Sequence, residues 1–223
     1  MNVQDQRTAP GGLDWLPLGE VIAVLRTDAA GLLDPVVETL AGAGIRSIEL
    51  TLTTPGVLEH LDAVRALVGP EVRLGVGTVL SAEQAHSAIA AGADYLVTPS
   101  LAPEALAAGV GAGVPVLGGA MTPSEAQAQW GAGAAAVKIF PAQTVGPAFV
   151  KHLHGPFPGL PVVPSGGVGL DQVAPWLDAG ARAVSLGGPL VGDASRASGD
   201  LLGLAARSRQ VLEIVDRWLE GRS

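Results

Sequence analysis

The chain has 223 residues, 48% of them hydrophobic, and its 21 acidic and 13 basic side chains give a formal net charge of -8. This apolar content excludes a disordered chain, and the acidic balance argues against a nucleic-acid partner. With no cysteine, disulfides, thiol nucleophiles and cysteine metal ligands are excluded as well. That composition suits a reducing compartment, and we expect a cytoplasmic protein.

The first dozen residues are polar and include Pro10-Gly11-Gly12. They lack the apolar centre of a signal sequence, so we expect residues 1–12 to form a flexible arm ahead of one domain over residues 13–223. No apolar run approaches the roughly 18–20 residues that a membrane span needs, and we expect no membrane partner.

One pattern recurs along the rest of the chain. A helical segment ends in Ala-Gly or Gly-Ala-Gly, and a short apolar run follows. Glycine at such a point supplies the left-handed residue that ends a helix and turns the chain back. The copies are Ala41–Gly44, Ala91–Ala93, Gly111–Gly113, Gly131–Gly133 and Ala179–Ala181.

Further apolar runs bring the predicted strands to eight, with successive starts about 20–27 residues apart. Continuous apolar runs are typical of parallel strands that are buried on both faces. The predicted strands are Val21–Leu25, Ser47–Thr51, Leu74–Gly77, Tyr95–Thr98, Pro115–Gly118, Ala136–Ile139, Val162–Ser165 and Ala183–Leu186. The predicted helices are Asp34–Gly42, Pro55–Leu67, Ser81–Ala91, Pro103–Ala108, Pro123–Gly131, Pro147–His152, Asp171–Ala179 and Leu201–Glu220.

Eight strand–helix units in this length predict an α/β fold, a single (β/α)8 TIM barrel. An open doubly wound sheet is the alternative. The sequence has no Gly-x-Gly-x-x-Gly turn after a strand, which argues against that alternative.

Lys138 is one of only two lysines and lies in the apolar run Ala134–Pro141. A buried ammonium is costly unless it is paired or neutralised. Lysine, unlike arginine, can lose its proton and act as a nucleophile. The alternative is a structural lysine whose head reaches solvent at the strand end. If Lys138 points inward, Ala136 does too, and its small side chain leaves room.

The active site of such a barrel lies at the carboxyl ends of its strands. Glu49, on the second strand, would face the same interior as Lys138, and the two can serve as acid/base and nucleophile. A structural ion pair of Glu49 with Lys138 or Arg26 remains open. Other residues at these strand ends are Arg26, Thr51, Thr53, Thr78, Thr98, Pro99, Ser100, Phe140, Pro141 and Ser165.

Two glycine pairs, Gly166-Gly167 and Gly187-Gly188, end the last two predicted strands. In TIM barrels the loops at this place often hold a phosphate on backbone N–H groups. Simple turn formation is the alternative.

The histidines and tryptophans carry less information. None of the histidines has metal-ligand spacing, so we expect packing or surface roles for all of them and no metal site. We also expect Trp130 and Trp176 to pack rather than to bind a ligand. The histidines are His60, His86, His152 and His154.

Several segments resemble the class I aldolases of the 2-keto-3-deoxy-6-phosphogluconate (KDPG) and 4-hydroxy-2-oxoglutarate (KHG) family. They are Ile48–Leu52, Gly75–Leu80, Val97–Pro99, Val137–Pro141 and Ser165–Val168. The resemblance runs in order from about Val21 to Trp218. It implies a lyase with a (β/α)8 fold that acts in carbohydrate metabolism of the Entner–Doudoroff type. It also implies a cytoplasmic homotrimer that uses no metal or other cofactor.

By this resemblance Lys138 forms a Schiff base with a 2-keto acid and Glu49 is the acid/base. Thr78 would hold the pyruvyl end, and Pro99 and Phe140 would shape the wall. Substrate hydroxyl or phosphate contacts would come from Ser165, Gly166 and Gly167, with Arg26, Thr53, Gly187 and Gly188 as further substrate contacts. Cleavage of a 2-keto-3-deoxy-6-phospho sugar acid would release pyruvate and an aldehyde such as glyceraldehyde 3-phosphate.

Two positions depart from the family pattern. Thr53 stands where many gluconate-type members have an arginine, whereas Arg26 and Gly146-Pro147 match the galactonate branch. Pro189 stands where the family often has a serine, and proline offers neither a hydroxyl nor an N–H to a phosphate. The identity of the sugar acid therefore stays open. A sugar-phosphate epimerase or isomerase and a non-catalytic ketoacid-binding homologue are the alternatives.

Overall fold

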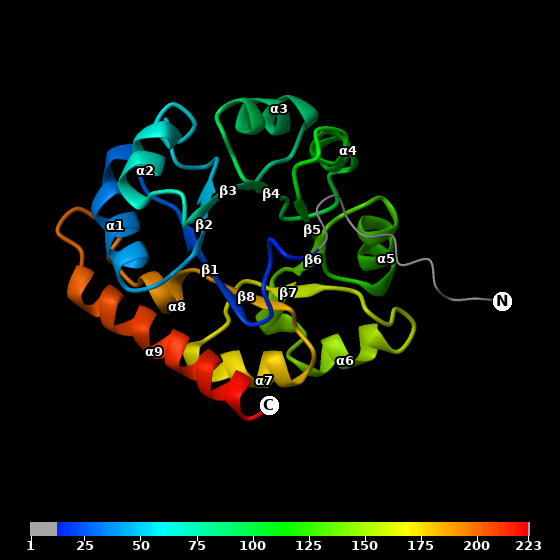
Figure 1. The fold of residues 1–223 in the computed structure, drawn as a ribbon. Coiled ribbons are helices and arrows are strands. Elements are labelled where there is room, and N and C mark those ends of the chain that lie inside the picture. The colour runs from blue at the N-terminus through cyan, green and yellow to red at the C-terminus, as the bar shows by residue number, and fades with distance from the viewer. Residues whose placement is uncertain (1–12, 223) are drawn as a thin grey trace.

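The computed structural model describes residues 13–222, so the arm expected at residues 1–12 lies outside the described residues. Eight parallel strands form a barrel inside a ring of helices (Figure 1). The strands are β1 (Glu20–Leu25), β2 (Ser47–Thr51), β3 (Arg73–Gly77), β4 (Tyr95–Val97), β5 (Val116–Ala120), β6 (Ala136–Ile139), β7 (Val162–Pro164) and β8 (Ala183–Leu186). The predicted (β/α)8 architecture is confirmed.

The helices follow the strands in alternation. They are α1 (Asp34–Gly42), α2 (Leu61–Val68), α3 (Ala82–Ala90), α4 (Pro103–Gly111), α5 (Pro123–Gly131), α6 (Ala148–His154), α7 (Val173–Asp178), α8 (Gly188–Val191) and α9 (Leu201–Glu220). Short 3-10 helices occur at η1 (Ala30–Leu32), η2 (Ala142–Thr144) and η3 (Leu170–Gln172).

The barrel closes in sequence order. Each strand pairs in parallel with the next from β1 to β7, and β8 pairs with β1. The seam between β7 and β8 is joined by an isolated parallel bridge between Ser165 and Ser185. At its other end the Arg182 N–H donates to the Val162 carbonyl at 2.8 Å. The alternative of an open doubly wound sheet is wrong, because the first and last strands are neighbours.

The recurring glycines end helices as predicted. One glycine in each copy of the pattern has a positive φ, between +73° and +105°, a conformation that costs other residues about 1–2 kcal/mol. These residues are Gly44, Gly92, Gly113, Gly133 and Gly180. At the opposite helix ends, Ser81 caps α3 and Thr122 forms a reciprocal capping box with Glu125 on α5. Local sequence therefore sets many of the helix boundaries.

Two predicted helices are wrong in extent. The helix expected at Pro55–Leu67 begins only at Leu61, because Gly56 has a φ of +74°, which an α-helix does not accommodate. The helix expected at Asp171–Ala179 is divided into η3 and α7. Pro175 cannot donate a hydrogen bond and falls in the first turn of α7, where no donor is needed. The short α8 was not predicted; the other ends differ by at most three residues.

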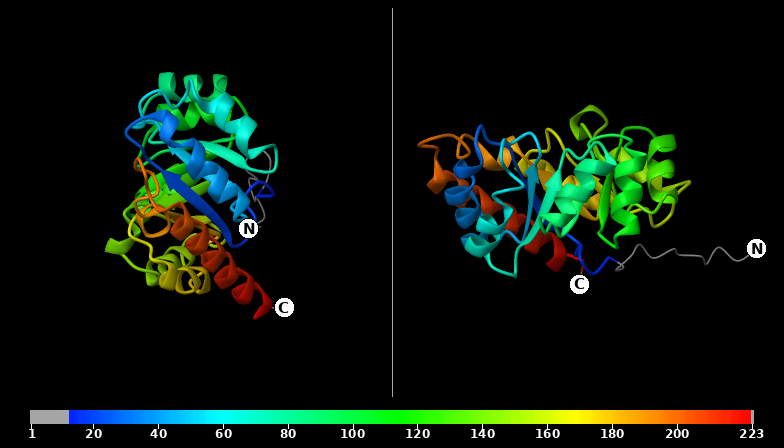
Figure 2. Two further views of the ribbon diagram at one scale, coloured as in Figure 1. Left: turned by 90° about the vertical axis from the view of Figure 1, so that its left-hand side faces the viewer. Right: turned by 90° about the horizontal axis from the view of Figure 1, so that it is seen from above.

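The C-terminal helix α9 lies along the outside of the barrel beside α1, α7 and α8 (Figures 1 and 2). Its buried face includes Leu204, Val211 and Val215. Within residues 13–222, no helix combines the length and the apolar character needed to cross a membrane.

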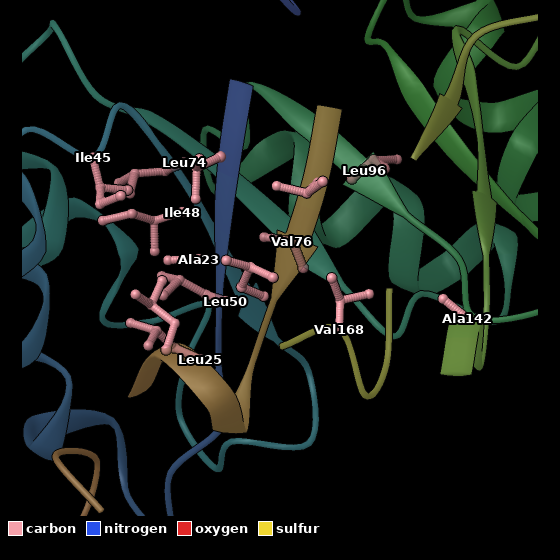
Figure 3. Packing of buried hydrophobic residues seen from close by; sticks show 14 of the residues in the cluster. Ala23, Leu25, Ile45, Ile48, Leu50, Leu74, Val76, Leu96, Ala142 and Val168 are labelled. Atoms are coloured by element: carbon pink, nitrogen blue, oxygen red, sulfur yellow. The ribbon is translucent and has the colours of Figure 1, made fainter. Parts of the chain in front are cut away.

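Apolar side chains fill two separate regions. Outward-facing strand residues such as Ile48, Leu50 and Val76 pack in the layer between the strands and the helices (Figure 3). A smaller cluster fills the barrel interior, with Trp15 packed against it. Its members are Leu16, Ile22, Tyr95, Val97, Leu117, Ala136, Val163 and Ala183. This cluster forms an apolar floor beneath the carboxyl ends of the strands.

Candidate active site

Lys138 of β6 and Glu49 of β2 meet inside the barrel. The Nζ atom of Lys138 lies 3.2 Å from Oε1 and 3.3 Å from Oε2 of Glu49. The two side chains are only 7% and 2% exposed. The lysine head therefore does not reach solvent at the strand end, and the ion pair left open for Glu49 forms with Lys138. Charges this deeply buried are tolerated because each satisfies the other.

A glycine on the neighbouring strand β3 makes room for Glu49. A Cβ atom on Gly77 of β3 would lie 2.6 Å from Cδ of Glu49, so the carboxylate rests on bare backbone. Gly119 of β5 makes room for a different group, the turn after β4, because a Cβ there would lie 2.6 Å from the carbonyl oxygen of Thr98. Ala136 lies in the interior cluster, two residues before Lys138 on the same strand. The predicted inward direction of both side chains is therefore confirmed.

Thr78, which follows β3, has a φ of +62°. A left-handed conformation is strained for a β-branched residue. Hydrogen bonds hold the chain on both sides, because the Leu52 N–H donates to the Gly77 carbonyl and the Val79 N–H donates to the Val97 carbonyl. Thr78 is thus fixed, partly buried, at the mouth between β2 and β4.

Pro99 lies in a turn that is anchored to β5. The Gly119 N–H donates to Oγ1 of Thr98 at 2.9 Å, and that hydroxyl donates to the Ser100 carbonyl at 2.9 Å. Gln129 of α5 donates to the carbonyls of Ser100 and Gly119, at 3.2 and 2.8 Å. Gln129 is not among the site residues predicted from the sequence. Its signal is its place three residues after Ala126 on the buried face of α5.

Phe140 and the glycine turn after β7 lie against one another. The Phe140 ring centroid is 5.7 Å from Nζ of Lys138, within range of a cation–π contact. A Cβ on Gly166 would lie 2.9 Å from two carbons of that ring. The Ala142 N–H donates to the Ser165 carbonyl at 2.7 Å, and the Gln143 N–H donates to the Gly166 carbonyl at 3.1 Å. Gly166 and Gly167 have φ values of +85° and +76°, which suits glycine.

Arg26 and Thr53 lie exposed at the ends of β1 and β2. Buried threonines hold the backbone on both sides of Arg26. Oγ1 of Thr51 donates to the Leu25 carbonyl at 3.1 Å and lies 3.0 Å from Oγ1 of Thr53. Oγ1 of Thr54 accepts from the Thr27 N–H at 3.1 Å. Within residues 13–222 the Arg26 guanidinium forms no ion pair. Thr54 is likewise not among the site residues predicted from the sequence.

Gly187 and Gly188 lie where β8 passes into α8. Gly187 is partly buried and Gly188 is exposed. Pro189 occupies the first turn of α8, where its missing N–H leaves no helical hydrogen bond unmade.

Tyr95 of β4 is a buried titratable residue that was not predicted to belong to the site. Its ring lies over Gly75 of β3, as Glu49 lies over Gly77. Burial raises the pKa of its phenol well above the ordinary value, and the charges of Glu49 and Glu20 raise it further. Among the described residues, its hydroxyl has no hydrogen-bond partner.

The remaining predictions concern metal ligands and tryptophans. In the part of the chain that the structure describes, no group of three or more His, Cys, Asp or Glu side chains could hold a metal ion. Nε2 of His60 lies 2.6 Å from Oδ1 of Asp34. Trp176 is a buried member of the outer core, and Trp130 packs against that core, as expected for packing residues.

Comparison with known proteins gives consistent matches. A family model described as KDPG and KHG aldolase matches residues 14–204. A 2-dehydro-3-deoxy-phosphogluconate aldolase of Treponema pallidum (strain Nichols) is 37% identical over 183 residues, covering 81% of this chain and 86% of that protein. A 2-dehydro-3-deoxy-6-phosphogalactonate aldolase of Escherichia coli (strain K12) is 32% identical over 179 residues, covering 80% and 87%.

Solved structures give the same result. One described as a native KDPGal structure has a TM-score of 0.81 at 29% identity, covering 90% of this chain and 96% of that chain. The KDPG aldolase from Legionella pneumophila, with pyruvate captured at low pH as a covalent carbinolamine intermediate, has a TM-score of 0.75 at 27% identity. It covers 93% of this chain and 97% of that chain.

Proposed function

The chain belongs to the KDPG and KHG aldolase family, and from that premise we propose which of its residues carry out the reaction. The protein is a class I aldolase that cleaves KDPG or a related substrate. The observation that carries the proposed assignment is the buried contact of Lys138 with Glu49. It joins a potential nucleophile to a potential base in a site shielded from water.

In the first step Lys138 captures the substrate. Transfer of one proton from Nζ to the Glu49 carboxylate leaves a neutral amine, which is the nucleophilic form. The amine attacks the C2 carbonyl of the 2-keto acid and forms a carbinolamine. Glu49 returns the proton to the carbinolamine hydroxyl, which leaves as water, and an iminium remains on Lys138.

In the second step the carbon–carbon bond breaks. The Glu49 carboxylate takes the proton of the C4 hydroxyl, the C3–C4 electron pair moves into the iminium, and an aldehyde leaves. Glu49 then protonates C3 of the enamine, and hydrolysis of the new iminium releases pyruvate and restores the amine. Proton transfer by a positioned side chain contributes about 10²–10⁴-fold to such reactions.

The remaining residues of the mouth are proposed to bind the substrate. Thr78 holds the pyruvyl end, Pro99 and Phe140 form the wall, and Ser165 contacts a substrate hydroxyl. The phosphate lies on the glycine turns, whose residues are Gly166, Gly167, Gly187 and Gly188.

Arg26 is proposed to bind the same phosphate. It is an exposed cation on a fixed backbone, and guanidinium groups bind phosphate in a bidentate manner. Thr53 adds a hydroxyl rather than a second cation. We infer a 2-keto-3-deoxy-6-phospho sugar acid as substrate and glyceraldehyde 3-phosphate as the aldehyde.

The assembly and location are proposed from the family resemblance. We expect a homotrimer in the cytoplasm whose chemistry is carried by Lys138 without a metal or another cofactor. Leu80 and Leu101, which are 54% and 48% exposed in the loops after β3 and β4, are apolar surface that contact with another copy would cover. Light scattering of the purified protein tests the trimer.

Borohydride reduction in the presence of pyruvate tests the role of Lys138. The reduced adduct is expected on the peptide that contains Lys138, and Lys138→Ala and Lys138→Arg are expected to remain unmodified. The matched control is Lys151→Ala, which removes the only other lysine of the chain, an exposed residue of α6. Absence of an adduct, or an adduct on Lys151, would contradict the assignment.

A substrate panel tests the specificity. It compares gluconate- and galactonate-configured acids, with and without phosphate, by pyruvate release. Arg26→Ala is expected to raise KM more for the phosphorylated acids than for the others. Proton exchange without an adduct would favour an epimerase or isomerase, and pyruvate binding without cleavage would favour a non-catalytic homologue.

A further inference from the structure

Two serine hydroxyls meet where the barrel closes. Ser165 follows β7 and Ser185 lies in β8, and the two residues form the isolated bridge of the β7–β8 seam. Oγ of Ser165 donates to Oγ of Ser185 at 3.2 Å. Ser165 is 5% exposed and Ser185 is 1% exposed. A polar pair that is buried this well has a defined geometry, because its alternative partners in water are excluded.

Both side chains face the barrel interior above the apolar floor. Side chains two residues apart on a strand point to the same side. Ala136, Val163 and Ala183 belong to the interior cluster, and Lys138, Ser165 and Ser185 follow each of them by two residues. The three adjacent strands β6, β7 and β8 therefore present one amine and two hydroxyls at one level of the mouth.

The direction of the hydrogen bond makes the two hydroxyls different, because one is the donor and the other the acceptor. Because the Ser165 proton is directed to Ser185, the Ser165 oxygen is left to accept a hydrogen bond from a ligand. The Ser185 hydroxyl has no second hydrogen bond within residues 13–222, and Ser185 is the more deeply buried of the two residues. It therefore lies behind Ser165 and acts on a ligand through it.

We propose that Ser185 is a specificity-determining positioning residue, which orients the Ser165 hydroxyl to accept a hydrogen bond from the C5 hydroxyl of the substrate. This inference rests on the proposed function. In that mechanism the C4 hydroxyl gives its proton to Glu49, so C5 carries the hydroxyl that remains free to donate. The pair selects aldehydes that carry a hydroxyl next to the carbonyl, because a deoxy aldehyde supplies no donor to the buried Ser165 oxygen.

The test is aldol condensation of pyruvate with two matched aldehydes, glyceraldehyde 3-phosphate and its 2-deoxy analogue, 3-phosphooxypropanal. The measured quantity is the ratio of kcat/KM for the two aldehydes. Ser165→Ala and Ser185→Ala are each expected to lower this ratio about 2- to 10-fold, the range for one hydrogen bond. The double variant is expected to match Ser165→Ala alone, because Ser185 acts only through Ser165.

A size-matched variant separates hydrogen bonding from packing. Ser185→Cys keeps the volume but is a weak hydrogen-bond partner, so it is expected to behave as Ser185→Ala does. Thermal melting of each variant reports any loss of stability.

An unchanged ratio in Ser185→Ala overturns the proposal. So does an equal loss of rate on both aldehydes, which is the signature of a structural role, or additive losses in the double variant. The borohydride assay is run on the same samples. If wild type forms no pyruvate adduct, the proposed function fails and this inference fails with it. If the adduct forms and the ratio does not respond, only this inference fails.

Discussion

Replacing Gly77 by alanine tests whether the position of Glu49 limits the reaction. Gly77 has no positive φ, so alanine is compatible with its backbone, and the added methyl is the sole perturbation. That methyl would lie 2.6 Å from Cδ and 2.7 Å from Cγ of Glu49. The side chain of Glu49 must therefore move away from β3.

The size of this movement follows from the contact distances. Separating the new Cβ from Cδ of Glu49 by an ordinary contact of about 3.4 Å requires a shift of about 0.8 Å. The carboxylate oxygens lie only 3.2 and 3.3 Å from Nζ of Lys138, so a shift of this size in most directions breaks the contact. A misplacement of about 1 Å costs on the order of 10²-fold in rate, and overpacking costs about 1–3 kcal/mol of stability.

Pyruvate release from the best substrate of the panel measures the effect. We expect kcat/KM of Gly77→Ala to fall about 100-fold, with melting lowered by about 2–12 °C, since each kcal/mol corresponds to about 2–4 °C in a chain of this size. The matched control is Gly111→Ala in α4, where an added Cβ meets nothing within 4 Å. Wild-type kcat/KM in Gly77→Ala, or an equal loss in Gly111→Ala, would refute the reasoning.

Three further predictions concern other parts of the mouth and the barrel interior. Gly166→Ala and Gly159→Ala both place alanine at a φ near +85°, costing about 1–2 kcal/mol. Only Gly166→Ala also clashes with Phe140, so only it should raise KM; equal kinetics in both variants would count against the contact. Tyr95 is the only tyrosine, and its raised pKa means that the free energy of unfolding falls as pH rises above about 10, where only the unfolded state ionises. Tyrosinate absorbance should therefore appear only with unfolding, and Tyr95→Phe should weaken the pH dependence of melting; tyrosinate in the folded protein near pH 10 would contradict this. Thr54→Val leaves the buried Thr27 N–H without an acceptor, so it should cost about 1–3 kcal/mol in denaturant unfolding, whereas Thr54→Ser should not.

Much of the fold is readable from local sequence because local physics determines it. Glycines such as Gly44 and Gly133 end helices through their positive φ, and this requirement acts on a few neighbouring residues. The helix expected from Pro55 failed for the same kind of reason, since Gly56 also has a positive φ but lies inside an otherwise helical pattern. Periodicity alone does not say which glycine adopts that conformation.

The residues of the candidate site also fall into two groups, those that the sequence predicts and those that it does not. Lys138 and Glu49 were found because an ionisable side chain is costly in an apolar strand, and that cost is visible in the sequence. Gln129, Thr54 and Ser185 were missed because serine, threonine and glutamine are unremarkable in the sequence. Their importance comes from partners that are 10, 27 and 20 residues away.

The sequence by itself determined the repeated strand–helix unit, the barrel that eight such units form, and the two ionisable residues that had to be accommodated inside it. Only the tertiary structure decided that Lys138 pairs with Glu49 across 89 residues rather than with solvent, and that Gly77 makes the space for this contact. It also decided that the seam closes through Ser165 and Ser185. The physical reason is range: helix ends and strand burial depend on neighbours along the chain, whereas a buried polar contact depends on which side chains barrel closure brings together.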